Sequence, residues 1–233
     1  MKLGIVIPTY QRKDGTTPNF LIRALESIKK QTYQNFKVYL IGDCYESNDE
    51  FEYLATSIIP KEKIFFENLP IAVERDRYPD GGAPLWRCGG INAANYGNKK
   101  CYNDGINYIC QLDHDDYWDA MHLEIIAHTI KLTNDSSFLF TCSQHFNNQY
   151  LPNVVLDNNI IEQVPIPAGM IRSSACINYD ALPLLYRDTF FETGVPDAAD
   201  ADLWKRIKYK CENDKLKSYL IRSLTCYHLE ENH

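Results

Sequence analysis

The chain has 233 residues, enough for one large domain or two small ones. Hydrophobic residues make up 45% and charged residues 24%, which is the balance of an ordinary globular protein and excludes a disordered or low-complexity chain. The formal net charge of −7 argues against nucleic acid as a partner, so an anionic substrate would need a metal ion or a local Arg/Lys cluster.

No apolar run approaches the roughly 18 residues needed to span a bilayer. The first apolar stretch, residues 3–7, is shorter than a signal-peptide core of about 7–15 residues. The chain has eight cysteines, and none are in C-x-x-C spacing, which favours buried reduced thiols over a disulfide framework. We therefore expect a soluble, cytoplasmic protein with no integral membrane segment.

The first expected element is a strand over residues 3–7, a continuous apolar run typical of a parallel sheet buried on both faces. Ligands of open α/β sheets bind beyond the carboxyl ends of strands. The polar residues that follow this strand are therefore candidate ligand contacts, although a plain polar loop is an equal alternative. They are Thr9, Tyr10 and Arg12.

A helix follows, with Thr17 as its expected N-cap and Pro18 as its first residue, and it ends near residue 30. Residues 36–41 alternate and predict a second strand, which ends close to Asp43. A carboxylate at that strand end can accept hydrogen bonds from a ribose or from a base edge.

Residues 64–66 predict a short third strand, and residues 68–87 then read as an irregular stretch. Such a length is unusual for a loop in a compact domain, and long loops are commonly functional or disordered. Arg87 stands just before a glycine pair and an expected helix over residues 91–96. Its charge and position make it a candidate phosphate contact.

The stretch that dominates the sequence is residues 108–118, an apolar strand that ends in three carboxylates. Asp113, Asp115 and Asp116 surround His114, and like charges this close require a cationic partner. Carboxylate oxygens suit Mg²⁺ and Mn²⁺, which could bridge the protein to a diphosphate. The alternative is a solvated acidic turn after a strand.

The second half is less regular. We expect a helix over residues 123–130, strands over 138–142, 154–155, 160–161 and 217–224, a strand or loop over 169–177, and a helix from about residue 200. Asp200 and Asp202 have two alternative roles. Either their negative charges simply stabilise the N-terminus of that helix, or one of them projects into a cleft and acts as a base. Strands alternating with helices, followed by a mixed half, predict a single α/β domain with an antiparallel addition.

Together these motifs resemble those of the family 2 glycosyltransferases, inverting enzymes of the GT-A fold. Residues 5–12 (I-V-I-P-T-Y-Q-R) and 24–36 (A-L-E-S-I-K-K-Q-T-Y-Q-N-F) are similar to the family's opening strand and first helix. Residues 112–118 (L-D-H-D-D-Y-W) look like its D-x-D motif, and residues 191–206 look like its F-x-E…E-D-x-D-L-W-x-R. Four motifs in the right order make the resemblance specific.

The resemblance implies a Rossmann-like, mainly parallel sheet flanked by helices, with residues 1–118 binding a nucleotide-diphosphate sugar and residues 119–233 binding a carbohydrate-bearing or hydroxyl acceptor. Asp115, with Asp113 and His228, would hold Mn²⁺ or Mg²⁺, and Asp200 would be the catalytic base, with Asp202 second. The donor-binding set would be Pro8, Thr9, Tyr10, Arg12, Asp43, Arg87, Asp113, His114 and Asp115.

Two departures from the family pattern leave alternatives open. The D-D-G-S-T-D that usually follows the second strand is replaced here, which alters the nucleoside pocket, and Ala199 stands where the base normally has an acidic neighbour. A nucleotide-sugar-binding module without transfer activity is therefore one alternative. A nucleotidyltransferase is another, although residues 9–13 lack the Gly-rich loop it would need, and a phosphohydrolase would carry its D-x-D after the first strand.

Overall fold

A ten-stranded mixed sheet forms the centre of the computed structural model, which describes residues 1–229. Its strands follow the order β3-β2-β1-β4-β9-β6-β10-β5, with β7 paired to β6 and β8 to β10. The strands are β1 (Leu3–Thr9), β2 (Phe36–Asp43), β3 (Ile64–Leu69), β4 (Tyr108–Gln111), β5 (Tyr117–Trp118), β6 (Ser136–Gln144), β7 (Tyr150–Leu151), β8 (Ile160–Glu162), β9 (Ala175–Asn178) and β10 (Lys217–Tyr227).

Strands β1 to β4 are parallel to one another, and β6 and β10 form a second parallel pair. Between the two groups lies β9, which runs antiparallel to both β4 and β6. The predicted parallel sheet with an antiparallel addition in the second half is confirmed. The carboxyl ends of β1, β2 and β4 meet at one edge, as parallel pairing requires.

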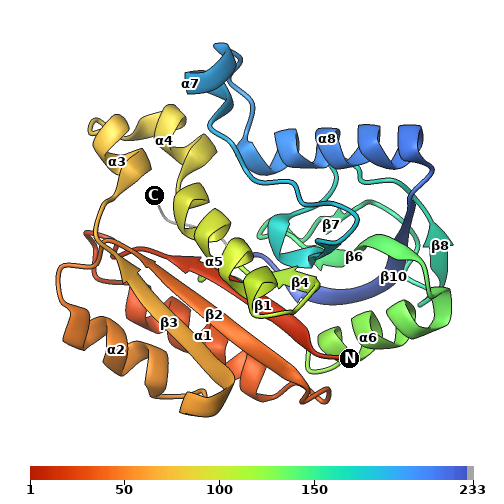
Figure 1. Ribbon diagram of the computed structural model, residues 1–233, viewed down its shortest axis with the longest axis horizontal. Helices are drawn as coiled ribbons and strands as arrows, with labels where there is room; N and C mark the ends of the chain where they lie inside the picture. The colour runs from red at the N-terminus through yellow and green to blue at the C-terminus, as the bar shows by residue number, and fades with distance from the viewer. Residues whose placement is uncertain (230–233) are drawn as a thin grey trace.

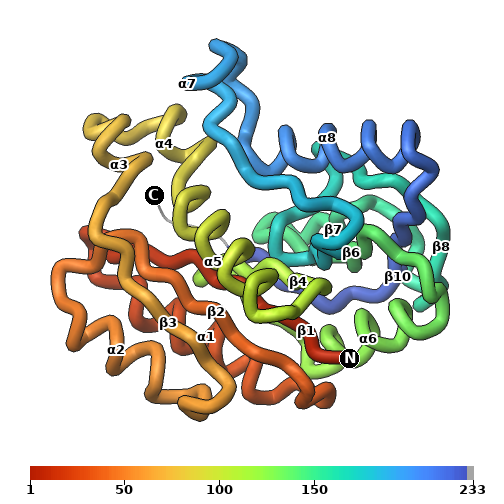
Figure 2. Tube along the Cα trace, in the orientation of Figure 1, coloured from red at the N-terminus to blue at the C-terminus, as the bar shows by residue number. Residues whose placement is uncertain are grey.

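Helices cover both faces of the sheet (Figure 1). One buried cluster packs α1, α2 and α6 on one face, and a second packs α5 and α8 on the other. The helices are α1 (Thr17–Lys29), α2 (Asn48–Thr56), α3 (Val73–Arg77), α4 (Gly82–Cys88), α5 (Ile91–Asn103), α6 (His122–Thr133), α7 (Thr189–Thr193) and α8 (Ala199–Asp214), with short 3-10 turns η1 (Lys61–Lys63) and η2 (Arg172–Ser174). Figure 2 shows the chain of α7 standing away from the sheet, beside α3 and α4.

Helix α5 lies unusually close to the sheet because of Gly97. A Cβ added there would come within 2.7 Å of a Val6 methyl group on β1 and 3.0 Å of Ile41 Cγ1 on β2. The first contact is closer than carbon atoms tolerate and the second is tight, so any larger residue here would require the neighbouring groups to shift.

Several local expectations were wrong. Helix α2 was not expected, yet its N-cap is readable, because the Ser47 hydroxyl accepts from the Glu50 amide at 3.1 Å. The stretch expected to be irregular contains α3 and α4, and α5 extends well beyond residue 96. No strand forms at residues 154–155. Thr16, not Thr17, is the N-cap of α1, since Thr17 instead bonds to Tyr10 and Arg12.

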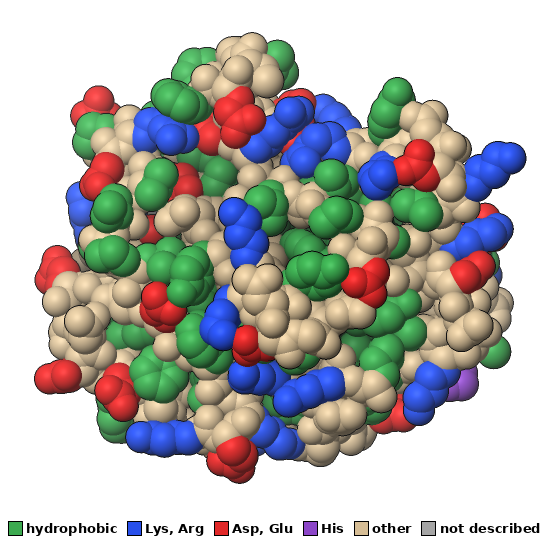
Figure 3. Space-filling model, in the orientation of Figure 1, with side chains coloured by type: hydrophobic (Ala, Val, Ile, Leu, Met, Phe, Trp, Pro, Cys, Tyr) green, Lys and Arg blue, Asp and Glu red, His purple; other side chains and the backbone are tan. Residues whose placement is uncertain are grey.

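The surface and the cysteines agree with a globular, reduced chain. Figure 3 shows acidic and basic side chains interspersed on the visible face rather than gathered by sign. All eight cysteines are free, and seven are buried. Within residues 1–229, no helix combines the length and the apolar character that a membrane crossing requires.

Candidate active site

The three carboxylates that follow β4 each have a different cationic partner. Asp115 Oδ2 lies 3.0 Å from an Arg12 guanidinium nitrogen, and both side chains are almost completely buried. Asp113 Oδ1 accepts from Arg172 Nε at 2.7 Å, and Asp116 Oδ1 lies 2.8 Å from His228 Nδ1. The repulsion anticipated from the sequence is therefore relieved by cations that three distant segments supply.

These ion pairs set the charge of the site. Burial opposes a charged His228, but the hydrogen bond to Asp116 and the nearby carboxylates outweigh it and raise the pKa of His228 to about 9. Burial likewise opposes the charge of Arg172, and the Asp113 carboxylate more than compensates, so the pKa of Arg172 is raised. Both side chains are therefore cationic at neutral pH.

The loop of carboxylates is fixed further by side chains from η2 and α1. Ser173 Oγ donates to Asp116 and accepts from the Asp113 backbone amide at 2.9 Å. Arg23 donates to the Asp115 carbonyl oxygen. The sequence analysis did not identify Arg172, Ser173 or Arg23 as site residues. In the sequence, Arg172 and Ser173 are marked only by belonging to a polar triplet, residues 172–174, just before the apolar residues 175–177.

The residues predicted to contact the nucleoside lie at the ends of β1 and β2. Pro8 and Thr9 are buried at the end of β1, and Thr9 Oγ1 lies 2.7 Å from the Tyr45 hydroxyl. The Tyr10 ring meets the His114 ring edge-on at 5.4 Å between centroids, and the Arg75 guanidinium lies 5.8 Å from the Tyr10 centroid. The residues predicted here therefore do come together.

Asp43 has a carboxyl oxygen available for a ligand. The residue is 2% exposed, and its Oδ2 lies 3.3 Å from Arg75 Nε. Its Oδ1 is buried and has no hydrogen-bond partner among the described residues. Burial raises the pKa of Asp43, with Arg75 acting against it. An unpaired buried acceptor of this kind fits an N–H or O–H group of a nucleoside.

Among the described residues, Arg87 is not bonded to those at the ends of β1 and β2. It lies half-buried on α4 and makes no hydrogen bond or ion pair within residues 1–229. Arg75, twelve residues earlier on α3, is the arginine that reaches the end of β2. Arg87 as a phosphate contact stays a prediction.

The two candidate bases at the start of α8 differ in their surroundings. Burial raises the pKa of Asp200, and its carboxylate interacts electrostatically with Arg172 and Asp113 of the carboxylate cluster. Asp202 is 5% exposed and bound by Arg187 at 2.7 and 2.9 Å and by Arg206 at 2.7 Å. These arginines overcome the effect of burial and lower the pKa of Asp202. Asp202 is thus engaged by arginines, and Asp200 as the catalytic base stays a prediction.

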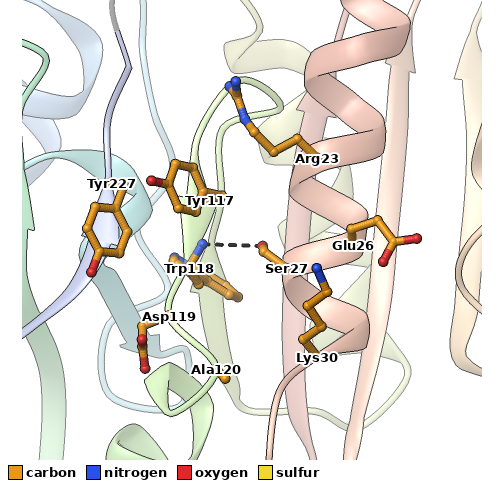
Figure 4. Close-up of a pocket in the computed structure, with 9 residues that line it drawn as sticks. All are labelled: Arg23, Glu26, Ser27, Lys30, Tyr117, Trp118, Asp119, Ala120 and Tyr227. Atoms are coloured by element: carbon orange, nitrogen blue, oxygen red, sulfur yellow. Dashed lines mark hydrogen bonds between the residues drawn. The ribbon is translucent and has the colours of Figure 1, made fainter.

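Two cavities border the site. The larger, of about 530 Å³, lies behind the carboxylate loop between α1 and the β5–β10 edge (Figure 4). There the Tyr117 and Tyr227 rings stack at 4.8 Å, and Ser27 Oγ accepts from the Trp118 amide at 3.2 Å. The smaller, of about 230 Å³, lies between α3, α5 and residues 186–192.

The predicted metal set was tested against the donor atoms. Among residues 1–229, no three His, Cys, Asp or Glu side chains converge as a metal-binding group. Asp113, Asp115 and His228 bond to Arg172, Arg12 and Asp116 instead. A cation held by Asp115 together with substrate phosphates, as Mg²⁺ commonly is, therefore stays a prediction.

The chain is similar to proteins named glycosyltransferases. An uncharacterized glycosyltransferase of Acanthamoeba polyphaga mimivirus is 36% identical over 238 residues, covering 99% of this chain and 95% of the relative. Another, from Rickettsia bellii, is 28% identical over 217 residues, covering 88% of this chain and 27% of its own length. No protein-family model matches the chain.

The fold is shared with solved structures of S. aureus TarS. The TarS complex with UDP matches 99% of this chain with a TM-score of 0.71 at 14% identity, and the complex with UDP-GlcNAc matches 100% with the same score. This chain spans about 61% of the TarS chain in the first complex. The predicted GT-A-like fold is confirmed. From its near full-length relationship to the mimivirus protein, the chain belongs to the glycosyltransferases.

Proposed function

We propose that this glycosyltransferase moves a sugar from a nucleoside diphosphate donor to an acceptor hydroxyl, with metal assistance and inversion at the anomeric carbon. The observation that carries the proposal is that the Asp200 carboxylate interacts electrostatically with Arg172, the residue that bonds to Asp113 of the D-x-D stretch. Burial also raises the pKa of Asp200, as suits a proton acceptor.

The donor is proposed to lie across the ends of β1, β2 and β4. Asp43 Oδ1 would accept from the nucleoside, and Tyr10 offers a ring beside it. TarS has been solved with UDP and with UDP-GlcNAc, which supports a uridine diphosphate sugar as the first donor to test. The acceptor would be a hydroxyl of a glycan, a lipid-linked sugar or a protein.

In this proposal Asp115 would hold Mn²⁺ or Mg²⁺, which when bound neutralises charge on the diphosphate. Asp200 accepts the proton of the acceptor hydroxyl as that oxygen bonds to the anomeric carbon. The bond between that carbon and the diphosphate oxygen breaks, and the nucleoside diphosphate leaves with the electron pair from the opposite face. Arg172 bonds to Asp113 and interacts electrostatically with Asp200, so it can stabilise negative charge that develops near them.

The test combines a binding panel with one substitution. UDP-, GDP-, CMP- and dTDP-sugars are compared by thermal shift with and without Mn²⁺, because a ligand of the native state raises the melting temperature. We expect a metal-dependent shift with one nucleotide, and release of that nucleotide when acceptors are added. Asp115→Asn should abolish the metal dependence. Transfer that continues unchanged in chelator and in Asp115→Asn would contradict the metal role.

A further inference from the structure

The 230 Å³ cavity between α3, α5 and residues 186–192 has a built interior that the proposed chemistry does not use. Its wall includes Glu74 and Arg77 from α3, Asn92 from α5, and Tyr186, Phe191 and Glu192. The volume lies below the roughly 300–1,000 Å³ of pockets that enclose drug-sized ligands. The space therefore suits one small ring rather than an extended chain.

Glu74 is the unusual member of this wall. It is only 2% exposed, and its Oε1 accepts from the Asn92 backbone amide at 2.9 Å. Its Oε2 is buried and has no hydrogen-bond partner among the described residues. Burial, followed by the charge of Asp43, raises the pKa of Glu74 to about 7. A buried carboxyl oxygen left unpaired is costly, so its retention on a cavity wall points to a ligand that donates to it.

The charges around the cavity select the class of ligand. Arg77 is already bonded to Asp188 at 2.7 Å, and Arg187 is held by Asp202. Both arginines in this wall are therefore already paired, so an anionic ligand would find no free cation here. An uncharged molecule with a hydroxyl group would find an acceptor in Glu74 Oε2.

The remaining wall residues suit a ring with one apolar face. Phe191 is 65% exposed and has the Arg77 guanidinium 3.9 Å from its centroid, which leaves the other ring face open to a ligand. The Asn92 side chain makes no hydrogen bond within residues 1–229 and can serve a second hydroxyl. Apolar rings with a few placed polar groups are typical of small-molecule pockets.

Tyr186 connects this cavity to the reaction centre. It lines the cavity, and the Arg172 guanidinium lies 5.4 Å from its ring centroid. Arg172 in turn bonds to Asp113 and interacts electrostatically with Asp200. One aromatic wall thus separates the cavity from the groups proposed to carry out the transfer.

We propose that this cavity holds one uncharged sugar ring of the transfer reaction, with a ring hydroxyl donating a hydrogen bond to Glu74 Oε2. The inference rests on the proposed transfer function. The ring belongs either to the donor or to the acceptor, and both present the same hydroxyl chemistry, so the experiment separates the two sources.

The experiment compares wild type with Glu74→Gln, Asn92→Ala and the control Glu192→Gln, an acid exposed at the rim of the same cavity. UDP and UDP-GlcNAc binding are measured by calorimetry, and transfer to a panel of methyl glycosides is measured at varied concentrations of each substrate. Asn92→Ala keeps the backbone amide that bonds Glu74, so it alters the cavity without removing that contact.

We expect Glu74→Gln either to weaken UDP-GlcNAc binding relative to UDP binding, or to raise the KM for the methyl glycoside. The expected change is about tenfold or more, because a hydrogen bond to a charged acceptor is lost. UDP affinity should not change. Asn92→Ala should move the same constant in the same direction, and Glu192→Gln should leave it within about twofold. A change confined to UDP-GlcNAc binding identifies the donor sugar, and a change confined to the glycoside KM identifies the acceptor.

Transfer by wild type with unchanged constants in Glu74→Gln and Asn92→Ala would overturn this inference and leave the proposed function intact. Equal losses in Glu192→Gln, or a loss of UDP affinity in Glu74→Gln, would also overturn it, because either shows a general effect. Absence of transfer by wild type from every donor would instead overturn the proposed function.

Discussion

The contrast between Asp200 and Asp202 gives the sharpest prediction. Asp202 accepts three hydrogen bonds from two arginines at 2.7–2.9 Å and is 5% exposed, so Asp202→Asn should reduce stability. Removing one partner of a fully buried ion pair costs roughly 3–5 kcal/mol. The arginine side chains are 37% and 25% exposed, and water can therefore replace part of the loss.

After that discount, we expect Asp202→Asn to lower the free energy of unfolding by about 2 kcal/mol. For a chain of this size, that corresponds to a melting temperature about 4–8 °C lower. Its kcat should stay close to that of wild type at a temperature where the variant is folded, because Asp202 is occupied by arginines rather than directed at a substrate.

Asp200→Asn should behave in the opposite way. The substitution removes a carboxyl group whose charged form is disfavoured by burial, so the melting temperature should stay the same or rise slightly. General base catalysis contributes about 10²–10⁴-fold, and kcat should fall by that order. Differential scanning fluorimetry and initial rates of UDP release measure both quantities. A stable but inactive Asp202→Asn beside an active Asp200→Asn would refute the reasoning.

Four further outcomes are expected. The kcat of wild type should fall on the acid side at a pH above the 3.8 of an ordinary aspartate, because burial raises the pKa of Asp200, and an acid limb at or below that value would contradict its role as base. Glu74 has a pKa of about 7 in the folded state against an ordinary 4.5, so the stability it contributes is complete below pH 4.5 and is lost as the pH rises through 7. Urea unfolding should accordingly show that the free energy of unfolding of Glu74→Gln rises relative to that of wild type as the pH increases across that window, by up to roughly 3 kcal/mol. A difference in unfolding free energy that does not change with pH would exclude the titration. Asp43→Asn should weaken UDP binding about tenfold in calorimetry, while unchanged affinity would remove Asp43 from the nucleoside site. Gly97→Ala should destabilise the fold by about 1–3 kcal/mol in urea because its Cβ would meet Val6 and Ile41, unless α5 shifts without cost.

Sequence reasoning succeeded where one local pattern determines the structure. The continuous apolar runs of β1 and β4 identify buried parallel strands, and parallel strands carry their following residues to a common edge. For this reason Thr9, Asp43 and Asp115 all lie at or just after strand ends on the same edge of the sheet. The start of α8 was readable from a helical repeat, which placed Asp200 at a helix N-terminus.

The partners of the carboxylates could not be predicted in the same way. Arg172 reaches Asp113 only because β9, a strand of four residues, pairs with β4, and such a short strand has no measurable period. Helices α3 and α4 are five and seven residues long and lie among proline and glycine, so they resemble a loop. Glu74 and Arg75 were hidden within that apparent loop.

The antiparallel strand β9 also limits how this protein can be re-engineered. A chimaera that joins residues 1–118 to the second half of a relative would replace β9, and the foreign strand would have to pair with β4 in the register that sets Cys176 beside Cys110. A shift of one residue would turn its side chains to the opposite faces of the sheet and move Arg172, which lies in η2 just before β9, away from Asp113. Exchanges within the second half should therefore graft loops that keep β9, rather than replace whole halves.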